Sequence, residues 1–323
     1  RVGINDNFFE LGGHSILAVR LFVRIRKWAK IDLPLAVLFK SPTIRALAEV
    51  IDSNCATASV YKEGDAEFRI SSPARPWRSL VPIHPEGNRP PLFLIHAVGG
   101  NLLYYHSLLP HLGEDQPVYG LQARGVDGLL SPHSSIEEMA GHYIAEIRSV
   151  QSSGPYFLGG ASFGGTVIFE IAQQLSQQGE EIAFLALLDS IGPGSRGYSY
   201  SRNPVIMRIN RMQGDIMVRQ DSLPVYLAKR IYKYLSNRMR IFRVVVMHLM
   251  RRPIPLELRE SYLWRSHYKA LRRYQPRQYL GTITLFRGPE GESWPYNDPE
   301  LGWKDIAKGE LRIIVIPARH HEF

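Results

Sequence analysis

The chain has 323 residues, of which 45% are hydrophobic and 21% charged, a composition typical of soluble globular protein with room for two domains. No uncharged apolar run reaches the length of about 18 residues that a transmembrane helix needs, and the N-terminal segment lacks the apolar stretch of a secretory signal. The single cysteine, Cys55, excludes an internal disulfide and fits a reducing, cytoplasmic compartment.

The net charge of +9 is unevenly distributed. Residues 192–279 hold 19 Lys and Arg against 4 Asp and Glu, a local charge of +15, which leaves −6 for the rest of the chain. No zinc-ligand spacing, helix-turn-helix signature or aromatic-interleaved RNA motif accompanies the basic segment. We therefore expect no nucleic-acid partner and no metal site.

Residues 1–53 are predicted to form a small helical unit. Apolar residues recur with helical spacing between Ser15 and Trp28, and Pro42 suits the first turn of another helix that continues to Ile51. About fifty residues are few for an independent core. Because the sequence also lacks an initiator Met, we expect it to be part of a longer chain.

Residues 54–78 mix Ser, Ala, Gly, Pro and charged residues without periodicity, which predicts a linker. As a flexible coil, this segment would hold its ends roughly 25–30 Å apart. This segment is long enough to let the helical unit move and contact the rest of the chain.

From residue 79 the pattern changes to short apolar strands separated by helices. Such a pattern predicts a parallel sheet that is covered on both faces. A helical insertion over about 205–273 interrupts it. The predicted strands are 92–96, 118–121, 156–160, 182–188, 283–286 and 311–316.

Ser162 stands in Gly160-Ala161-Ser162-Phe163-Gly164, between a predicted strand and a predicted helix. Glycines around a serine at this position permit a tight, strained turn that lifts the hydroxyl above the sheet. The N–H of the next residue, Phe163, then faces a developing oxyanion. The pattern predicts Ser162 as a nucleophile and Phe163 as an oxyanion donor, with a structural turn as the alternative.

A serine hydroxyl is a weak nucleophile until a base removes its proton. In this type of site the acid follows the serine along the chain and the histidine comes last. Asp189 directly follows a buried strand and is the predicted acid. His320 and His321 both follow the last strand, and we favour His320 as the base while His321 stays open.

The second oxyanion donor is expected in the loop His96–Gly100, after an early strand. Backbone N–H groups matter there, and we assign the donor to Val98. His96 precedes the nucleophile, which breaks the chain order of the triad, so we interpret it as part of the loop architecture.

Ser15 lies in a different glycine-rich setting, Gly12-Gly13-His14-Ser15, at the start of the first predicted helix. This setting favours a place where a group is attached, because an exposed serine at a helix N-terminus is well placed to carry a phosphate. The alternative is a simple helix N-cap.

The elbow at Ser162, the loop His96–Gly100, Asp189 and a late histidine occur together in one family. On these features residues 79–323 resemble the thioesterase domains that end nonribosomal peptide synthetases. The resemblance implies an α/β-hydrolase fold with a helical lid, here at about 192–279.

Residues 1–53 resemble the peptidyl carrier domain, a small all-α bundle that precedes such a thioesterase. The resemblance rests on Asp6–Ser15 and Phe39–Ala48, and His14 in place of an acidic residue favours a peptidyl over a polyketide carrier. It implies that the first carrier helix lies before residue 1. It also implies that a separate phosphopantetheinyl transferase attaches 4′-phosphopantetheine from coenzyme A to Ser15.

Together the two resemblances imply a terminal carrier–thioesterase didomain, a serine hydrolase of natural-product or antibiotic synthesis. A peptidyl group would pass from phosphopantetheine on Ser15 to Ser162, with Asp189 orienting His320, and leave by hydrolysis or macrocyclisation. Upstream synthetase domains in the same or a preceding chain would supply the peptidyl substrate. The alternatives are the terminal thioesterase of a hybrid or polyketide synthase, and a non-catalytic carrier and docking module.

The insertion holds six of the seven methionines and an apolar stripe. Flexible thioethers suit a pocket for a bulky, variable acyl chain, but they equally suit packing between lid helices. A solvated helical face explains the excess of positive charge best, and contact with the carrier or its phosphate is a second reading. We do not expect a membrane partner. The methionines are Met207, Met212, Met217, Met239, Met247 and Met250.

Overall fold

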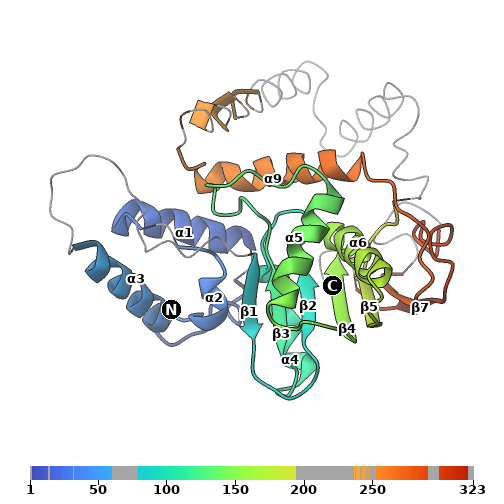
Figure 1. The fold of residues 1–323 in the computed structure, drawn as a ribbon. Coiled ribbons are helices and arrows are strands. Elements are labelled where there is room, and N and C mark those ends of the chain that lie inside the picture. Colours follow the sequence, from blue (N-terminus) through green and yellow to red (C-terminus); the bar gives the residue numbers. More distant parts are fainter. Residues whose placement is uncertain are drawn as a thin grey trace, which may run out of the picture.

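The computed structural model describes residues 2–13, 15–31, 33–59, 79–193, 252–289 and 298–318, with a few residues between 236 and 250. Figure 1 shows helices grouped at one side, next to a central sheet that further helices cover. The described part of the chain contains no helix that combines the length and the apolar character needed to cross a membrane.

The central sheet has the strand order β1-β3-β2-β4-β5-β6-β7. Only β1 runs antiparallel to its neighbour; every other pair is parallel. The six predicted strands are all present, and the parallel α/β arrangement is confirmed. The bounds are β1 (Leu80–His84), β2 (Leu92–Ile95), β3 (Val118–Leu121), β4 (Tyr156–Ala161), β5 (Ile182–Leu188), β6 (Ile283–Arg287) and β7 (Leu311–Val315).

Two helices with different patterns pack on the sheet. α6 (Phe163–Gln177) is apolar over most of its surface and is buried along nearly its whole length, as expected of a helix enclosed by its neighbours. α5 (Ile136–Arg148) is amphipathic, and its N-cap Ser135 accepts a hydrogen bond from the Glu138 N–H at 3.1 Å. The core around them is anchored by wholly buried aromatic residues such as Tyr143 and Trp303.

The N-terminal helices are α1 (Ser15–Ala29), α2 (Val37–Lys40) and α3 (Ile44–Ser59). They share a core of Phe22, Leu38 and Ile51, which also includes Leu103 and Leu256 from the rest of the chain. The helical unit therefore packs directly against the part that contains the sheet.

α3 is longer than the sequence pattern indicated. The sequence pattern places residues 54–59 in the linker, but in the structure they are the last residues of α3. The helix can extend this far because no glycine or proline interrupts the chain before Gly64. Residues 54–59 are therefore not part of a linker, and the rest of the predicted linker, residues 60–78, lies outside the described residues.

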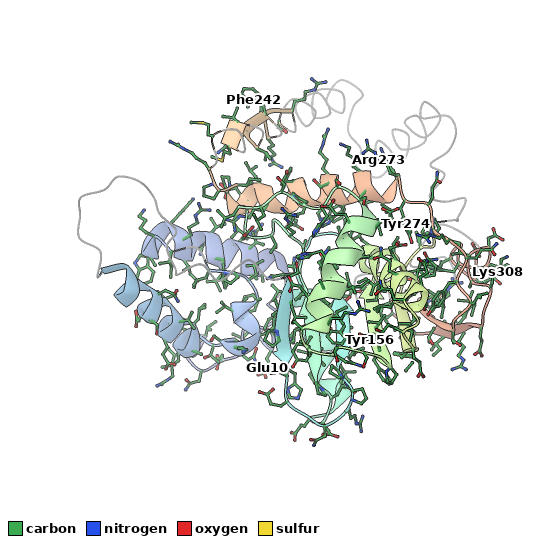
Figure 2. The ribbon with its side chains drawn as sticks, in the orientation of Figure 1. Glu10, Tyr156, Phe242, Arg273, Tyr274 and Lys308 are labelled. Atoms are coloured by element: carbon green, nitrogen blue, oxygen red, sulfur yellow. The ribbon has the colours of Figure 1, made fainter. Side chains whose placement is uncertain are left out.

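The predicted helical insertion contains α9 (Leu256–Leu271), which runs across the molecule above α1 and α5 in Figure 1. Just beyond it lies Tyr274 (Figure 2), whose hydroxyl donates to Glu170 of α6 at 2.7 Å. Met239 and Met250 are exposed on the surface, whereas Met207, Met212 and Met217 lie outside the described residues.

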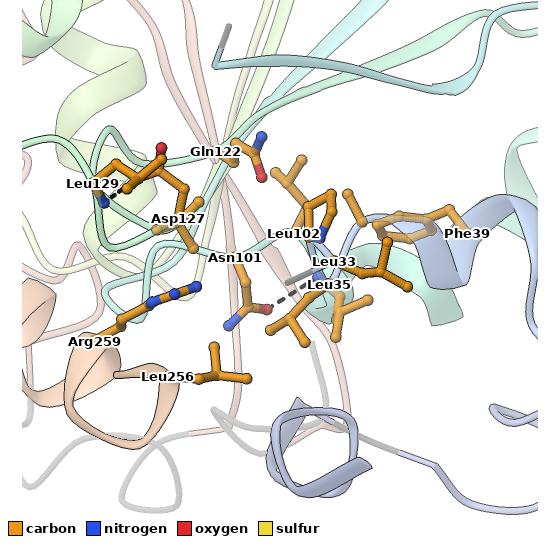
Figure 3. Close-up of a pocket in the computed structure, with 14 residues that line it drawn as sticks. Leu33, Leu35, Phe39, Asn101, Leu102, Gln122, Asp127, Leu129, Leu256 and Arg259 are labelled. Carbon is orange, nitrogen blue, oxygen red and sulfur yellow. Dashed lines mark hydrogen bonds between the residues drawn. The ribbon is translucent and has the colours of Figure 1, made fainter. Parts of the chain in front are cut away.

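The chain between β2 and β3 forms a short 3-10 helix, η1 (Leu103–Ser107), followed by α4 (Leu109–Leu112). A cavity of about 190 Å³ lies where this segment meets the N-terminal unit (Figure 3). Its walls include Leu35 and Phe39 on one side and Asn101, Asp127 and Arg259 on the other. The cavity between the N-terminal helices and the part that contains the sheet thus adjoins the loop that follows β2.

Candidate active site

Three neighbouring strands bring the predicted site residues to one edge of the sheet. β2 and β5 both pair in parallel with β4, with Ile95 opposite Gly160 and Ala161 opposite Leu188. Residues that follow these strands must therefore lie at the same carboxyl edge. They are the loop His96–Gly100, Ser162 and Asp189.

Ser162 occupies a strained turn between β4 and α6. Its φ of 53° and ψ of −117° are rare for a residue with a side chain, and such strain persists only where the surroundings hold it. Its N–H donates to the Leu188 carbonyl at 2.9 Å, and its carbonyl accepts from the Gly165 N–H at 3.1 Å and from the Ser190 hydroxyl at 2.7 Å. The half-buried Ser162 side chain thus projects from a fixed backbone.

The glycines around Ser162 allow the helix to approach the strands closely. A Cβ on Gly160 would lie 2.3 Å from the Gly164 carbonyl oxygen, and a Cβ on Gly164 would lie 2.7 Å from the carbonyl oxygens of Ile95 and His96. No side chain fits at either position. The spacing that predicted the elbow therefore has a direct steric cause.

Asp189 follows β5 and is buried, with only 1% of its surface exposed. It has a φ of 41°, and its N–H donates to the Phe286 carbonyl of β6 at 2.7 Å. Burial, and then the charge of this carboxylate, raise the pKa of Tyr104 in η1. Tyr104 is thus a neighbour of the predicted acid, which no sequence pattern indicated.

Tyr105 joins the strand ends on either side of the site. Its buried hydroxyl donates to the Ile95 carbonyl and accepts from the Ala161 N–H at 2.9 Å. It therefore links the residue before the loop His96–Gly100 to the residue before Ser162. The sequence offers no signal for this role beyond an aromatic residue after a glycine loop.

His96 is wholly buried and supports the loop, as the sequence indicated. Its Nδ1 lies 2.7 Å from the Ala97 carbonyl oxygen, which can only accept, so Nδ1 carries the proton. Its Nε2 then accepts from the Tyr143 hydroxyl at 2.8 Å. Burial, and then neighbouring His267, hold the pKa of His96 well below its usual value, so the ring is neutral.

The rest of the loop surrounds Val98, the predicted second donor. The Gly100 N–H donates to the Ala97 carbonyl at 2.9 Å, which turns the chain back on itself with a φ of 83° at Gly100. Val98 is half-buried, and its carbonyl oxygen lies 2.8 Å from Nδ1 of His267 in α9. His267 was not predicted, because it lies 169 residues away in the sequence.

Phe163, the predicted first donor, begins α6 directly after Ser162, and its side chain is buried. The predicted base falls in the segment that follows β7. His320 and its alternative His321 lie outside the described residues, so the choice between them stays a prediction.

Ser15 is the first residue of α1, as predicted. The preceding loop turns at Gly12, whose φ is 82°, and the Gly13 N–H donates to the Phe8 carbonyl at 2.8 Å. The first turn of α1 contains no acidic residue that would repel a phosphate, and the first N–H groups of a helix have no partner within the helix itself. This setting fits the attachment of a phosphate ester such as phosphopantetheine to Ser15.

Comparison with known families assigns both parts of the chain. Residues 90–323 match the thioesterase domain family, and residues 1–51 match the family of phosphopantetheine attachment sites.

Two relatives by sequence are peptide synthetases. The chain is 32% identical over 333 residues to a dimodular nonribosomal peptide synthase of Bacillus subtilis strain 168, across 100% of this chain and 13% of that protein. It is 44% identical over 190 residues to malpinin synthetase of Mortierella alpina, across 59% of this chain and 2% of that protein. The chain thus spans a small part of the length of each.

Two of the solved structures that resemble the chain illustrate the match. Holo-AB3403, a four-domain nonribosomal peptide synthetase bound to AMP and glycine, matches 99% of this chain and 23% of that chain, with a TM-score of 0.62 and 26% identity. The NocB thioesterase domain, in a covalent complex with a fluorophosphonate nocardicin G analogue, matches 75% of this chain and 90% of that one, with a TM-score of 0.52 and 21% identity. The second match shows the fold, which is that of the α/β hydrolases. The chain therefore belongs to the thioesterase domain family, and a phosphopantetheine carrier segment precedes the thioesterase domain.

Proposed function

We propose that the chain is the carrier–thioesterase didomain that releases the product of a nonribosomal peptide synthetase. The carrier is the small helical bundle that contains α1, α2 and α3, and the thioesterase begins at β1. The observation that carries the proposal is the strained, fully hydrogen-bonded backbone of Ser162 beside buried Asp189. The carrier segment before it, and the synthetases among its relatives, support a carrier-bound peptidyl group as the substrate.

Phosphopantetheine on Ser15 supplies, when attached, a thiol that holds the acyl group as a thioester. A separate phosphopantetheinyl transferase attaches it, and upstream synthetase domains deliver the peptidyl group. The lid, at about 192–279, includes α9 and closes over the acyl chain.

Ser162 performs the transfer. His320 takes the hydroxyl proton while Asp189 orients its ring, and the Ser162 oxygen bonds to the thioester carbonyl carbon. The carbonyl oxygen becomes an oxyanion that accepts hydrogen bonds from the N–H groups of Phe163 and Val98. His320 then gives its proton to the leaving sulfur as the C–S bond breaks, and Ser162 keeps the acyl group as an ester.

Release reverses these roles. His320 takes a proton from water or from a nucleophile within the peptide, and that oxygen or nitrogen attacks the ester. The C–O bond to Ser162 breaks, and His320 returns the proton to Ser162. Water gives a free acid, and an internal nucleophile gives a ring that is lighter by one water.

Replacing Ser162 tests the assignment directly. Ser162→Ala should lower the turnover of an acyl N-acetylcysteamine thioester by about 10⁴-fold or more, because it removes the oxygen that forms the acyl ester. A fluorophosphonate should label the native chain once and this variant not at all, by mass spectrometry. Ser152→Ala, at an exposed serine, is the matched control and should keep both activities. Unchanged labelling of Ser162→Ala would exclude the proposed nucleophile, and a native chain that is never labelled would favour a non-catalytic docking module.

The same measurements identify the base. His320→Ala should lose turnover nearly as completely as Ser162→Ala, whereas His321→Ala should retain it. The opposite result would move the base to His321.

A further inference from the structure

One side chain of α9 contacts both residues that we assign as oxyanion donors. His267 is wholly buried, and its Nδ1 lies 2.8 Å from the Val98 carbonyl oxygen. Its ring also stacks on Phe163, with the ring centroids 4.7 Å apart and the planes inclined by 13°. The lid segment therefore reaches the two sides of the proposed oxyanion hole through a single residue.

Two histidines hold two successive peptide units of the loop. A peptide unit is planar, so a bond that holds its carbonyl oxygen also orients the N–H of the next residue. His96, at 2.7 Å from the Ala97 carbonyl oxygen, holds the unit that carries the Val98 N–H. His267 holds the following unit, between Val98 and Gly99. Rotation about Val98 is thus restrained on both sides.

A role in packing alone does not explain a histidine here. The Val98 carbonyl can only accept, so Nδ1 of His267 carries the proton and Nε2 is a bare acceptor. That Nε2 is buried and has no hydrogen-bond partner in the part of the chain that the structure describes. A phenylalanine would stack on Phe163 without burying this unsatisfied nitrogen, which costs stability. The one contact that needs an imidazole is the donation to Val98.

The ring is neutral when it makes this contact. Burial lowers the pKa of His267 to about 4, so at neutral pH it carries one proton, on Nδ1. His267 therefore acts as a hydrogen-bond donor and contributes no charge to the oxyanion hole.

We propose that His267 is a positioning residue, through which α9 holds the Val98 carbonyl and the Phe163 ring and so keeps Val98 and Phe163 in the geometry needed for acyl transfer. The inference rests on the proposed function of Ser162. It makes α9 a part of the catalytic framework as well as of the lid, because the loop reaches its geometry only when α9 is seated.

Two variants separate the contacts of His267. His267→Phe keeps a ring that can stack on Phe163 and removes the donor to Val98. His267→Asn removes the ring but keeps a donor, since the Asn amide nitrogen is the same number of bonds from Cα as Nδ1 of histidine. Tyr274→Phe is the control: it removes a buried hydrogen bond next to α9, the one that the Tyr274 hydroxyl donates to Glu170 of α6 at 2.7 Å, and this bond involves no residue of the loop.

We expect His267→Phe to lower kcat for an acyl N-acetylcysteamine thioester by about 10- to 100-fold, less than the loss of a whole oxyanion donor. KM should not change, because His267 does not touch the substrate. His267→Asn should recover most of the kcat, and Tyr274→Phe should keep the native value. The urea midpoint of unfolding of each variant shows whether the loss of kcat is caused by a loss of stability of the folded protein.

Three results would overturn the inference: a native kcat in His267→Phe, a rise in KM that accounts for the loss, or an equal loss in Tyr274→Phe. A test in the resting protein does not depend on catalysis. Long-range ¹⁵N spectra should show the Nδ1–H tautomer for His267, and an Nε2–H tautomer would also refute the contact. Failure of the proposed function is separate, because Ser162→Ala would then leave turnover unchanged.

Discussion

The two serines that define the chain, Ser162 and Ser15, both stand beside paired glycines, yet those glycines act in different ways. Near Ser162, Gly160 and Gly164 bring a helix and a strand so close that no side chain fits between them. Before Ser15, only Gly13 is crowded in this way, since its Cβ would lie 2.3 Å from the Phe8 carbonyl oxygen, whereas Gly12 turns the chain in open space, with nothing within 4 Å of where its Cβ would lie. A nucleophile needs a backbone that cannot move, whereas an attachment site needs access. The motif at Ser162 therefore brings a helix against a strand, whereas the motif at Ser15 combines one crowded glycine with one exposed turn.

The largest expected effect is at Gly164. In Gly164→Ala the new Cβ would lie 2.7 Å from the carbonyl oxygens of Ile95 and His96, which belong to the backbone and cannot turn aside. We expect the free energy of unfolding to fall by about 3 kcal/mol, with loss of fluorophosphonate labelling at Ser162. Urea unfolding followed by tryptophan fluorescence, to which buried Trp303 contributes, measures the first effect.

The matched control is Gly141→Ala in α5, where the new Cβ would meet only the Gln174 side chain, at 3.7 Å. An alanine in the middle of a helix should stabilise the protein by about 0.5–1 kcal/mol. A Gly164→Ala variant as stable and as reactive as the Gly141→Ala variant would show that the close approach is not what the elbow needs.

The next expected effect is a difference in how the stabilities of the two regions, residues 1–53 and the part that contains the sheet, depend on pH. Burial is the main cause that lowers the pKa of both His133 and His267 to about 4, and both lie in the part that contains the sheet. Residues 1–53 contain only one histidine, His14. A histidine whose folded pKa is depressed stabilises the fold fully above its unfolded pKa of about 6.5, and this contribution is lost as the pH falls toward the folded value.

The unfolding free energy of the sheet part should therefore fall between about pH 6.5 and pH 4, by at most about 1.4 kcal/mol per pH unit for each histidine. His267→Phe should reduce that slope, since it removes one such group. Urea titrations of the native chain and of His267→Phe at several pH values measure this slope. An identical slope in the two proteins would mean that His267 is already accessible to protons in the folded state.

The residues that could be predicted from the sequence are those whose chemistry is local. Ser162 and Asp189 each follow an apolar strand, and the glycines that fit the elbow lie within two residues of the nucleophile, so the pattern shows them directly. Neither β1 nor α5 was predicted from the sequence. Pro82 interrupts the apolar pattern of β1, and α5 contains none of the catalytic residues that the sequence pattern indicates.

The residues that escaped prediction act through distant contacts. His267, Tyr104 and Tyr105 reach the site from α9 and η1, and each makes its contact with backbone or charge that the sequence places elsewhere. A lone histidine on an amphipathic helix is indistinguishable from a surface residue until the helix is seated. Only the packing of the insertion on the loop after β2 shows what His267 holds.

The smallest expected effect is at Gly12, and it tests the open turn before Ser15. In Gly12→Ala the new side chain meets nothing within 4 Å, but the φ of 82° is unfavourable for alanine by about 1 kcal/mol. Amide exchange in α1 should therefore quicken by about fivefold, while labelling of Ser162 stays native. Gly113→Ala has a φ of 83° and the same open surroundings, but it lies after α4, so it should leave exchange in α1 unchanged. Equal exchange in α1 for both variants would mean that the turn tolerates a side chain, and that the glycine serves access to Ser15 alone.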